Sequence, residues 1–236
     1  MAKKKFLKMW WLIIVVVIIA AILVGVFVFN KKDNNSQTAN SNSASTSTGS
    51  TVILPQTTFV NGLGSWYEEV WYQPKSSGGE VTTGPNGVTF KAIQANSRSG
   101  IMFNINKDVS DFSNVIIKVK GTANLQTLSG TGLNGREAPV AVAIAYKDAK
   151  GVDHNLLGED PTATGQMFWR GFYYMAPSGG TGIVNGVKVT QNEPFSYSFD
   201  LMTLNPKPKT IEFVSLEGAG WISREGSISS LSITAD

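Results

Sequence analysis

The stretch of sequence that decides the fold is residues 140–146, VAVAIAY, in which the side chains alternate along the chain with a period of two. The same alternation marks residues 115–119 (VIIKV) and residues 195–201 (FSYSFDL). A period of two is that of a β-strand, whose successive side chains point to opposite faces of a sheet. These runs therefore predict an all-β domain.

Turn chemistry separates the alternating runs. DAKG at residues 148–151 follows one of them, and Asn185 with Gly186 favours a hairpin between residues 183–184 and 187–189. No long helix is predicted in this part of the chain. The predicted strands lie near residues 64–73, 80–83, 87–94, 100–105, 114–120, 139–146, 152–157, 166–175, 183–190, 195–201, 209–217 and 227–234. Many short strands joined by glycine-rich turns predict an antiparallel β-sandwich over residues 58–236.

The first 30 residues have the composition of a membrane anchor. A lysine-rich start precedes an unbroken apolar run at residues 9–29, and a transmembrane helix needs about 20 apolar residues. A cleaved signal peptide has a shorter apolar region, followed by small residues at its cleavage site. We therefore predict one uncleaved transmembrane helix, a signal anchor, with the lipid bilayer as its partner.

The placement of lysines predicts the orientation of this helix. More lysines precede the apolar run than follow it, and positive residues tend to stay cytoplasmic. We expect a single-pass protein of the cell membrane with a cytoplasmic N-terminus and an extracytoplasmic C-terminal domain. Between the two, residues 31–57 are rich in Ser, Thr and Asn, a composition that predicts a flexible linker.

Composition excludes several classes of function. The chain has no cysteine, which excludes disulfides, thiolate metal sites and a catalytic cysteine. Its net charge of +3 owes much to the lysines beside the apolar run, so no nucleic-acid partner is predicted.

Several segments resemble the bacterial jelly-roll domains known as galactose-binding-like or carbohydrate-binding-module-like. The resembling segments are SGIMF at 99–103, DVSDF at 108–112, residues 115–121, IEFVSLEG at 211–218 and ISSLSI at 228–233. A narrower likeness, to bacterial envelope proteins, lies in QTLSGTG at 126–132, REAPVAV at 136–142 and WRGFYY at 169–174. The resemblance implies a jelly-roll sandwich. It leaves the function open, because that family includes ligand-binding, structural and enzyme-appended members.

Aromatic residues supply the flat surfaces that sugar recognition needs. Trp221, in a glycine-flanked loop, is a predicted ligand contact. On the strand near 166–175, Arg170 and Tyr174 share one face and Trp169 lies on the other. An arginine is rarely buried unpaired, so we expect the Trp169 face to point to the core, which leaves Arg170 and Tyr174 as ligand contacts.

Arg136 and Arg98 lie near the ends of predicted strands and are further candidates. An arginine can grip a carboxylate or donate to sugar hydroxyls. The alternative for both is an ion pair within the protein.

The inventory for enzyme chemistry is thin, and no catalysis is predicted. His154 is the single histidine, it follows a turn where we expect it to be solvated, and no Gly-x-Ser-x-Gly motif is present. A calcium ion needs oxygen ligands alone, and the resemblance implies one structural calcium. Asp108, Asp111 and Asp236 are its predicted ligands.

Together these features predict a membrane-anchored extracytoplasmic module that recognises carbohydrate without catalysis. The alternative is an envelope structural or assembly protein whose jelly roll binds other proteins. A cleft lined by aromatic and polar groups would favour glycan, whereas a broad apolar patch would favour a protein partner.

Overall fold

The computed structural model describes residues 49–68, 79–92, 98–127, 138–157, 164–175, 185–219 and 223–236. These residues form strands and one short 3-10 turn, η2 (Leu201–Thr203), so the prediction of an all-β domain is confirmed. None of the described residues forms a helix with the length and hydropathy of a membrane span. The predicted span at residues 9–29 and most of the predicted linker lie outside the described residues.

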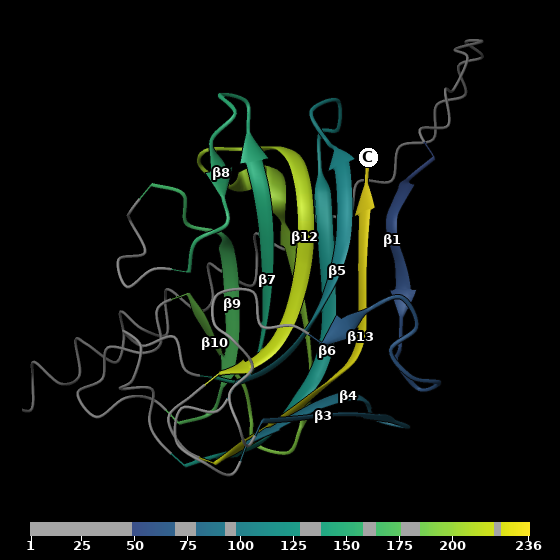
Figure 1. Cartoon of the computed structure of the whole chain (residues 1–236), viewed down its shortest axis with the longest axis vertical. Coiled ribbons are helices and arrows are strands. Elements are labelled where there is room, and N and C mark those ends of the chain that lie inside the picture. The colour runs from purple at the N-terminus through teal and green to yellow at the C-terminus, as the bar shows by residue number, and fades with distance from the viewer. Residues whose placement is uncertain are drawn as a thin grey trace, which may run out of the picture. The chain divides into compact units, whose positions relative to one another are not determined.

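The strands form two sheets that pack face to face (Figure 1). The first sheet has the order β11 (Pro194–Asp200), β6 (Val115–Gln126), β13 (Arg224–Ala235), β4 (Gly87–Ala92) and β3 (Gly79–Gly84), and β1 (Thr51–Thr57) also pairs with β13. The second sheet has the order β10 (Gly186–Lys188), β9 (Phe168–Tyr173), β7 (Ala138–Asp148), β12 (Pro208–Ala219), β5 (Arg98–Asp108) and β2 (Tyr67–Glu68), and β8 (Asp153–His154) pairs with β7.

The predicted antiparallel sandwich is confirmed, with one parallel exception among the ladders of the described strands. β10 pairs in parallel with β9 from Gly186 opposite Gly171 to Lys188 opposite Tyr173. Asn185 has the left-handed backbone that an Asn-Gly turn requires, with φ of 55°. The other arm of the hairpin predicted there, residues 183–184, lies outside the described residues.

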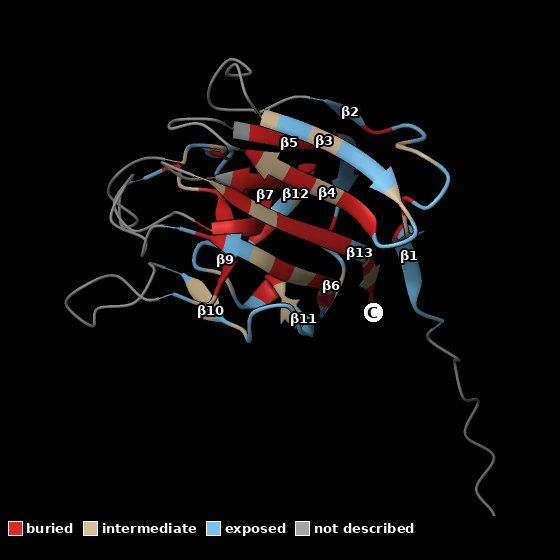
Figure 2. Cartoon of the chain, turned by 90° about the horizontal axis from the view of Figure 1, so that it is seen from below, coloured by how far each residue is buried: buried red, intermediate tan, exposed pale blue. Residues whose placement is uncertain are grey.

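The main core lies between the two sheets. In β6, Val115, Ile117 and Val119 are fully buried, while Lys118 and Lys120 on the opposite face are exposed. Figure 2 shows this burial concentrated along the strands of both sheets. Burying one large apolar side chain contributes about 1.5–3 kcal/mol to folding, so this shared layer holds the sheets together.

The linker prediction was wrong for its last seven residues, Thr51–Thr57, which form β1. β1 pairs antiparallel with the C-terminal half of β13, and Leu54 is 2% exposed in the main core. Leu54 is buried and Ile53 partly buried by this pairing, which the polar composition around them concealed, whereas Val52 stays exposed. Pro55, which has no N–H to donate, is tolerated because β1 pairs with β13 alone among the described strands and its register is irregular.

A second apolar cluster lies on the face of the second sheet that points away from the main core. Its buried members are Met102, Ala138, Ala141, Ala143, Ala145, Met167, Trp169, Tyr173 and Phe213. The indole of Trp169 lies over Gly171, where an added Cβ would come within 2.2 Å of its Cη2 atom. Its Nε1 donates to Glu217 Oε1 at 3.0 Å, across the small side chains of β7. Small residues thus let a tryptophan lie flat on the sheet.

The prediction of which face of β9 points to the core was wrong. Phe168 and Phe172, on the Arg170 face, belong to the main core, whereas Trp169 belongs to the second cluster. The polar group of Arg170 does not oppose this arrangement because Tyr197 of β11 accepts a hydrogen bond from it. Both faces of β9 are therefore apolar, with a paired arginine on the inner one.

Candidate functional site

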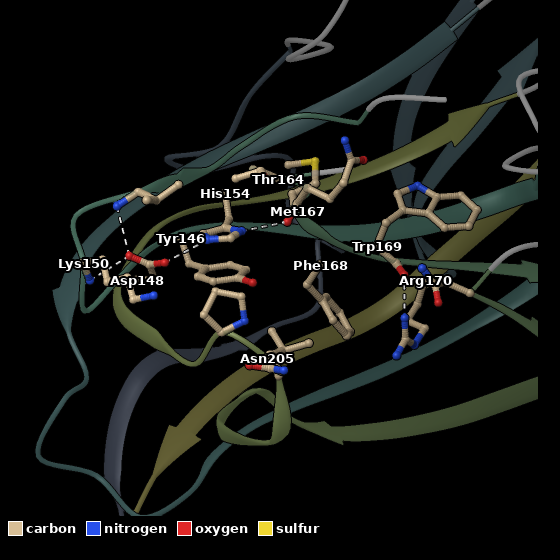
Figure 3. Close-up of a pocket in the computed structure, with 16 residues that line it drawn as sticks. Tyr146, Asp148, Lys150, His154, Thr164, Met167, Phe168, Trp169, Arg170 and Asn205 are labelled. Atoms are coloured by element: carbon tan, nitrogen blue, oxygen red, sulfur yellow. Dashed lines mark hydrogen bonds and ion pairs between the residues drawn. The ribbon is translucent and has the colours of Figure 1, made fainter. Parts of the chain in front are cut away.

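A pocket of about 580 Å³ opens beside the first half of β9, at one end of the second sheet (Figure 3). Its walls come from the end of β7, from β8, from the segment that leads into β9 and from the chain after η2. The lining residues are Tyr146, Asp148, Lys150, Val152, His154, Thr164, Gly165, Gln166, Met167, Phe168, Trp169, Arg170, Asn185, Leu204, Asn205 and Pro206. Segments far apart in the sequence therefore meet at one place.

The pairing of β9 explains why the pocket opens here. β10 pairs with Gly171, Phe172 and Tyr173, and among the described residues no strand continues beside residues 168–170 on that side. The sheet edge is therefore open over the first half of β9. Arg170 Nη1 donates to the carbonyl oxygen of Trp169 at 2.9 Å, so the side chain satisfies one backbone acceptor of this strand.

One end of the pocket is built around Asp148, the last residue of β7. Its Oδ1 accepts from the backbone N–H of Lys150 at 2.8 Å and from that of Val152 at 2.9 Å. Its Oδ2 lies 3.3 Å from His154 Nε2. The backbone N–H of Val152, followed by the His154 side chain and the N–H of Lys150, holds the pKa of Asp148 below its ordinary value. Asp148 is thus an ionised residue that closes the turn after β7.

His154 is buried, so the prediction of a solvated histidine was wrong. It is 4% exposed, and its ring stacks on Tyr146 with centroids 4.5 Å apart and planes 3° apart. The cause is the pairing of β8 with β7, which sets His154 directly opposite Tyr146. Nδ1 lies 3.3 Å from the carbonyl oxygen of Gln166, and Nε2 faces Asp148. Both ring nitrogens therefore already have partners within the protein.

Tyr146 is a wall residue rather than a base. Burial, reinforced by the charge of Asp148, raises the pKa of its hydroxyl to about 12. The phenol is therefore protonated at neutral pH. Its ring presents an apolar surface between His154 and the rest of the pocket, and Figure 3 shows the two rings side by side.

Arg170 lies at the other end of the pocket. Its Nε donates to Tyr197 Oη at 3.0 Å, which links the two sheets. The guanidinium carbon lies 4.7 Å from the ring centroid of Phe168 and 4.9 Å from that of Phe199. A guanidinium held by two aromatic rings and two hydrogen bonds has little freedom left to lose when it binds a ligand.

The rim of the pocket is polar and exposed. Lys150, Thr164, Asn185 and Asn205 are all exposed lining residues. The amides, the hydroxyl and the ammonium at the rim are exposed groups of the kind that bind sugar hydroxyls, whereas the aromatic side chains of the wall are almost fully buried. Sequence reasoning did not select Asn205, although a residue before proline marks a turn, and turns carry many binding residues.

The structure describes the side chains of two of the five predicted ligand contacts, Arg170 and Tyr174. Arg170 lines the pocket. Tyr174 does not, because its hydroxyl and backbone N–H both bond Gln126, which ties the end of β9 to β6. Arg98 lies on β5 with its side chain outside the description, and Arg136 and Trp221 lie outside the described residues. Ligand contact by any of these five residues stays a prediction.

Two of the three predicted calcium ligands form hydrogen bonds within the protein, Asp108 through its side chain and Asp236 through its backbone. Asp108 Oδ1 accepts from the Ser110 N–H at 2.9 Å and from its hydroxyl at 2.6 Å, and these bonds lower the pKa of Asp108. The backbone of Asp236 pairs with Asn114, and Asp111 is exposed. Within the described ranges, no three acidic or histidine side chains gather as a metal site. The calcium ion stays a prediction.

Comparison with known proteins gives matches among solved structures alone. No protein-family model matches the chain, and no curated protein matches it. A xylan-binding module CBM15 is 13% identical, with a TM-score of 0.41 over 78% of this chain and 97% of that one. A family 11 carbohydrate-binding module of a Clostridium thermocellum cellulase is 11% identical, with a TM-score of 0.39 over 80% and 95%.

A third solved structure that matches is the CBM22-1 xylan-binding domain from Paenibacillus barcinonensis Xyn10C. It is 9% identical, with a TM-score of 0.39 over 79% of this chain and 95% of that one. Carbohydrate-binding modules, the class to which the sequence resemblance points, are thus among the solved structures similar to this chain.

Proposed function

We propose that this chain is a non-catalytic carbohydrate-binding module and that the pocket beside β9 is its site. The observation that carries the proposal is the composition of the pocket. Aromatic side chains, amides, a guanidinium and an ammonium line a volume of about 580 Å³. Pockets for small ligands commonly enclose about 300–1,000 Å³, so one or two sugar rings fit.

Each kind of side chain has a part in holding a sugar. Phe168 and Trp169 are 3% and 1% exposed, so they support the pocket wall from behind and the exposed polar groups of the rim would make the contacts with a sugar. Asn185, Asn205 and Gln166 carry amides that both donate and accept, as sugar hydroxyls do. Protein groups that pair with several hydroxyls at once provide orientation and specificity.

The polar groups of the pocket support binding rather than hydrolysis. Glycoside hydrolysis commonly uses two carboxyl groups that flank the bond to be cleaved. Among the lining residues that the structure describes, Asp148 is the one carboxylate, and its oxygens already accept from Lys150, Val152 and His154. His154 has both ring nitrogens engaged within the protein.

The same proposal includes the place where the module works. The apolar run at residues 9–29 would hold the chain in the cell membrane, with the sandwich on the extracytoplasmic side. The polar segment before β1 would act as a tether, and some 20 residues of random coil reach about 25 Å. The glycan would then belong to the cell's own wall or come from outside.

A binding experiment with rim variants tests the proposal. The purified full-length chain is screened on a glycan array, and each hit is measured by calorimetry. Asn205→Ala removes one rim amide, and Asn185→Gly removes another while it keeps the left-handed backbone. Each change should weaken binding by about three- to ten-fold, the loss of one hydrogen bond.

The matched control is Asn192→Gly. Asn192 is also an exposed asparagine with a left-handed backbone, φ 61°, and it does not line the pocket. Affinity should stay unchanged in this variant. Binding to no glycan, together with recovery of an envelope protein on the immobilised chain, would instead support the alternative of an assembly protein.

A further inference from the structure

The described lining of the pocket carries more positive than negative charge. Among the described residues that line it, Lys150 and Arg170 are the cations of fixed charge and Asp148 is the one carboxylate. This described lining therefore has one more cation than carboxylate even when His154 is neutral. Figure 3 shows Lys150 and Arg170 toward opposite ends of the row of labelled side chains. Charge of one sign spread along a pocket attracts a ligand of the other sign.

The carboxylate does not neutralise these cations. Asp148 already accepts two backbone hydrogen bonds and faces His154. Lys150 contributes its backbone N–H to Asp148, but neither its ammonium nor the guanidinium of Arg170 forms an ion pair within the described part of the chain. Two cations of one pocket are thus left for an external anion.

Arg170 is also held in position for an anion. Its Nε and Nη1 each donate to a protein oxygen, and Phe168 and Phe199 pack on the guanidinium. A guanidinium has five N–H donors, so these two bonds leave others for a ligand in the pocket. A planar fork of such donors matches the two oxygens of a carboxylate.

We infer that the sugar held in this pocket is an acidic one, a hexuronate unit whose carboxylate pairs with Arg170 and whose other end lies near Lys150. This inference rests on the proposed function and names its ligand class. The amides of Asn185 and Asn205 then serve the hydroxyls. A neutral sugar of the same shape would leave both cations without an anionic partner, which is the basis of the selectivity.

The test compares three saccharides of one backbone. The full-length chain is titrated by calorimetry with a galacturonate trisaccharide, with the same trisaccharide after reduction of its carboxyl groups, and with a sulfated neutral counterpart. The uronate should bind at least about ten-fold more tightly than the reduced form, because a charge-assisted pair is lost on reduction. The difference in affinity between the uronate and its reduced form should decrease as salt is added.

Two variants and one control assign the effect to the pocket. Lys150→Gln should weaken uronate binding by about three- to five-fold, and Arg170→Lys by about ten-fold, with little change for the reduced sugar. Lys118→Gln removes the same charge from an exposed residue of the first sheet and should leave the uronate affinity unchanged. Thermal melting of each variant, with and without the uronate, separates loss of binding from loss of folding.

Each contrary result has a distinct meaning. Equal affinity for the uronate and its reduced form would overturn the inference while leaving the proposed function in place. If the sulfated sugar binds more tightly than the uronate, the anionic group that the pocket recognises is a sulfate ester and not a carboxylate. An equal loss in Lys118→Gln would show attraction by overall charge alone, and binding of no saccharide at all would remove the proposed function itself.

Discussion

The two sheets differ in what they carry on the faces that point away from the main core. In the first sheet this face is polar, and Lys118, Lys120 and Ser196 are exposed on it. In the second sheet the corresponding face is apolar, with Trp169 1% exposed and Phe213 8% exposed. The second sheet is thus filled with side chains on both faces, and the pocket opens at its end. β7 and β9 of the second sheet therefore have no exposed residue on either face.

The largest effect expected from this contrast is that of Gly171→Ala. A Cβ at Gly171 would lie 2.2 Å from Trp169 Cη2 and 2.8 Å from Ala138 Cβ, so the indole would have to leave its place. We expect overpacking of this kind to lower the free energy of unfolding by about 3 kcal/mol. Urea denaturation measures this change. Gly84→Ala in β3 is the matched control, since no described atom lies within 4 Å of its Cβ position. A loss in Gly171→Ala as small as that in Gly84→Ala would show that the second sheet tolerates an added Cβ at this position.

A smaller effect should appear as the pH falls. Asp108 and Asp148, the last residues of β5 and β7, have lowered pKa values because of hydrogen bonds that their carboxylates accept. A carboxyl group with a lowered pKa in the folded state stabilises the fold fully above its ordinary value of 3.8. That stabilisation is lost as the pH falls through the folded-state pKa.

Asp148→Asn removes this titration at one end of the second sheet. Urea denaturation from neutral pH down to about pH 2 should show a weaker loss of stability in the variant than in the unchanged chain. Asp108→Asn should act in the same direction. If both variants follow the unchanged chain at every pH, the acid sensitivity of the fold lies elsewhere than at the ends of these strands.

The smallest effect belongs to the outer face of the first sheet. Ser198→Ala changes an exposed side chain of β11, opposite Lys118 of β6, and should alter the unfolding free energy by less than about 0.5 kcal/mol. Ser215→Ala makes the same change at a buried position of the second sheet. The hydroxyl of Ser215 is buried and has no hydrogen-bond partner among the described residues, so its removal should leave the protein equally stable or slightly more stable.

Sequence patterns predicted one strand residue of the candidate site, Arg170, but not the pocket. Arg170 does line the pocket, although it was selected by assigning the Trp169 face of β9 to the core, which was wrong. His154 and Asn205 were not selected, because the first was expected in solvent and the second carries no pattern beyond a turn. Their roles depend on the pairing of β8 with β7 and on the position of the chain after η2.

The sequence by itself determined that the domain is a β-sandwich, because a period of two is a local property of each strand. Residues 140–146 alternate between Val or Ile and Ala, and such alternation forms a strand whichever way it faces. Only the tertiary structure decided that Phe168 faces the main core and Trp169 the second cluster, and that residues 51–57 join β13. When both faces of a strand are apolar, only packing against other strands distinguishes them, and those contacts join residues distant in the chain.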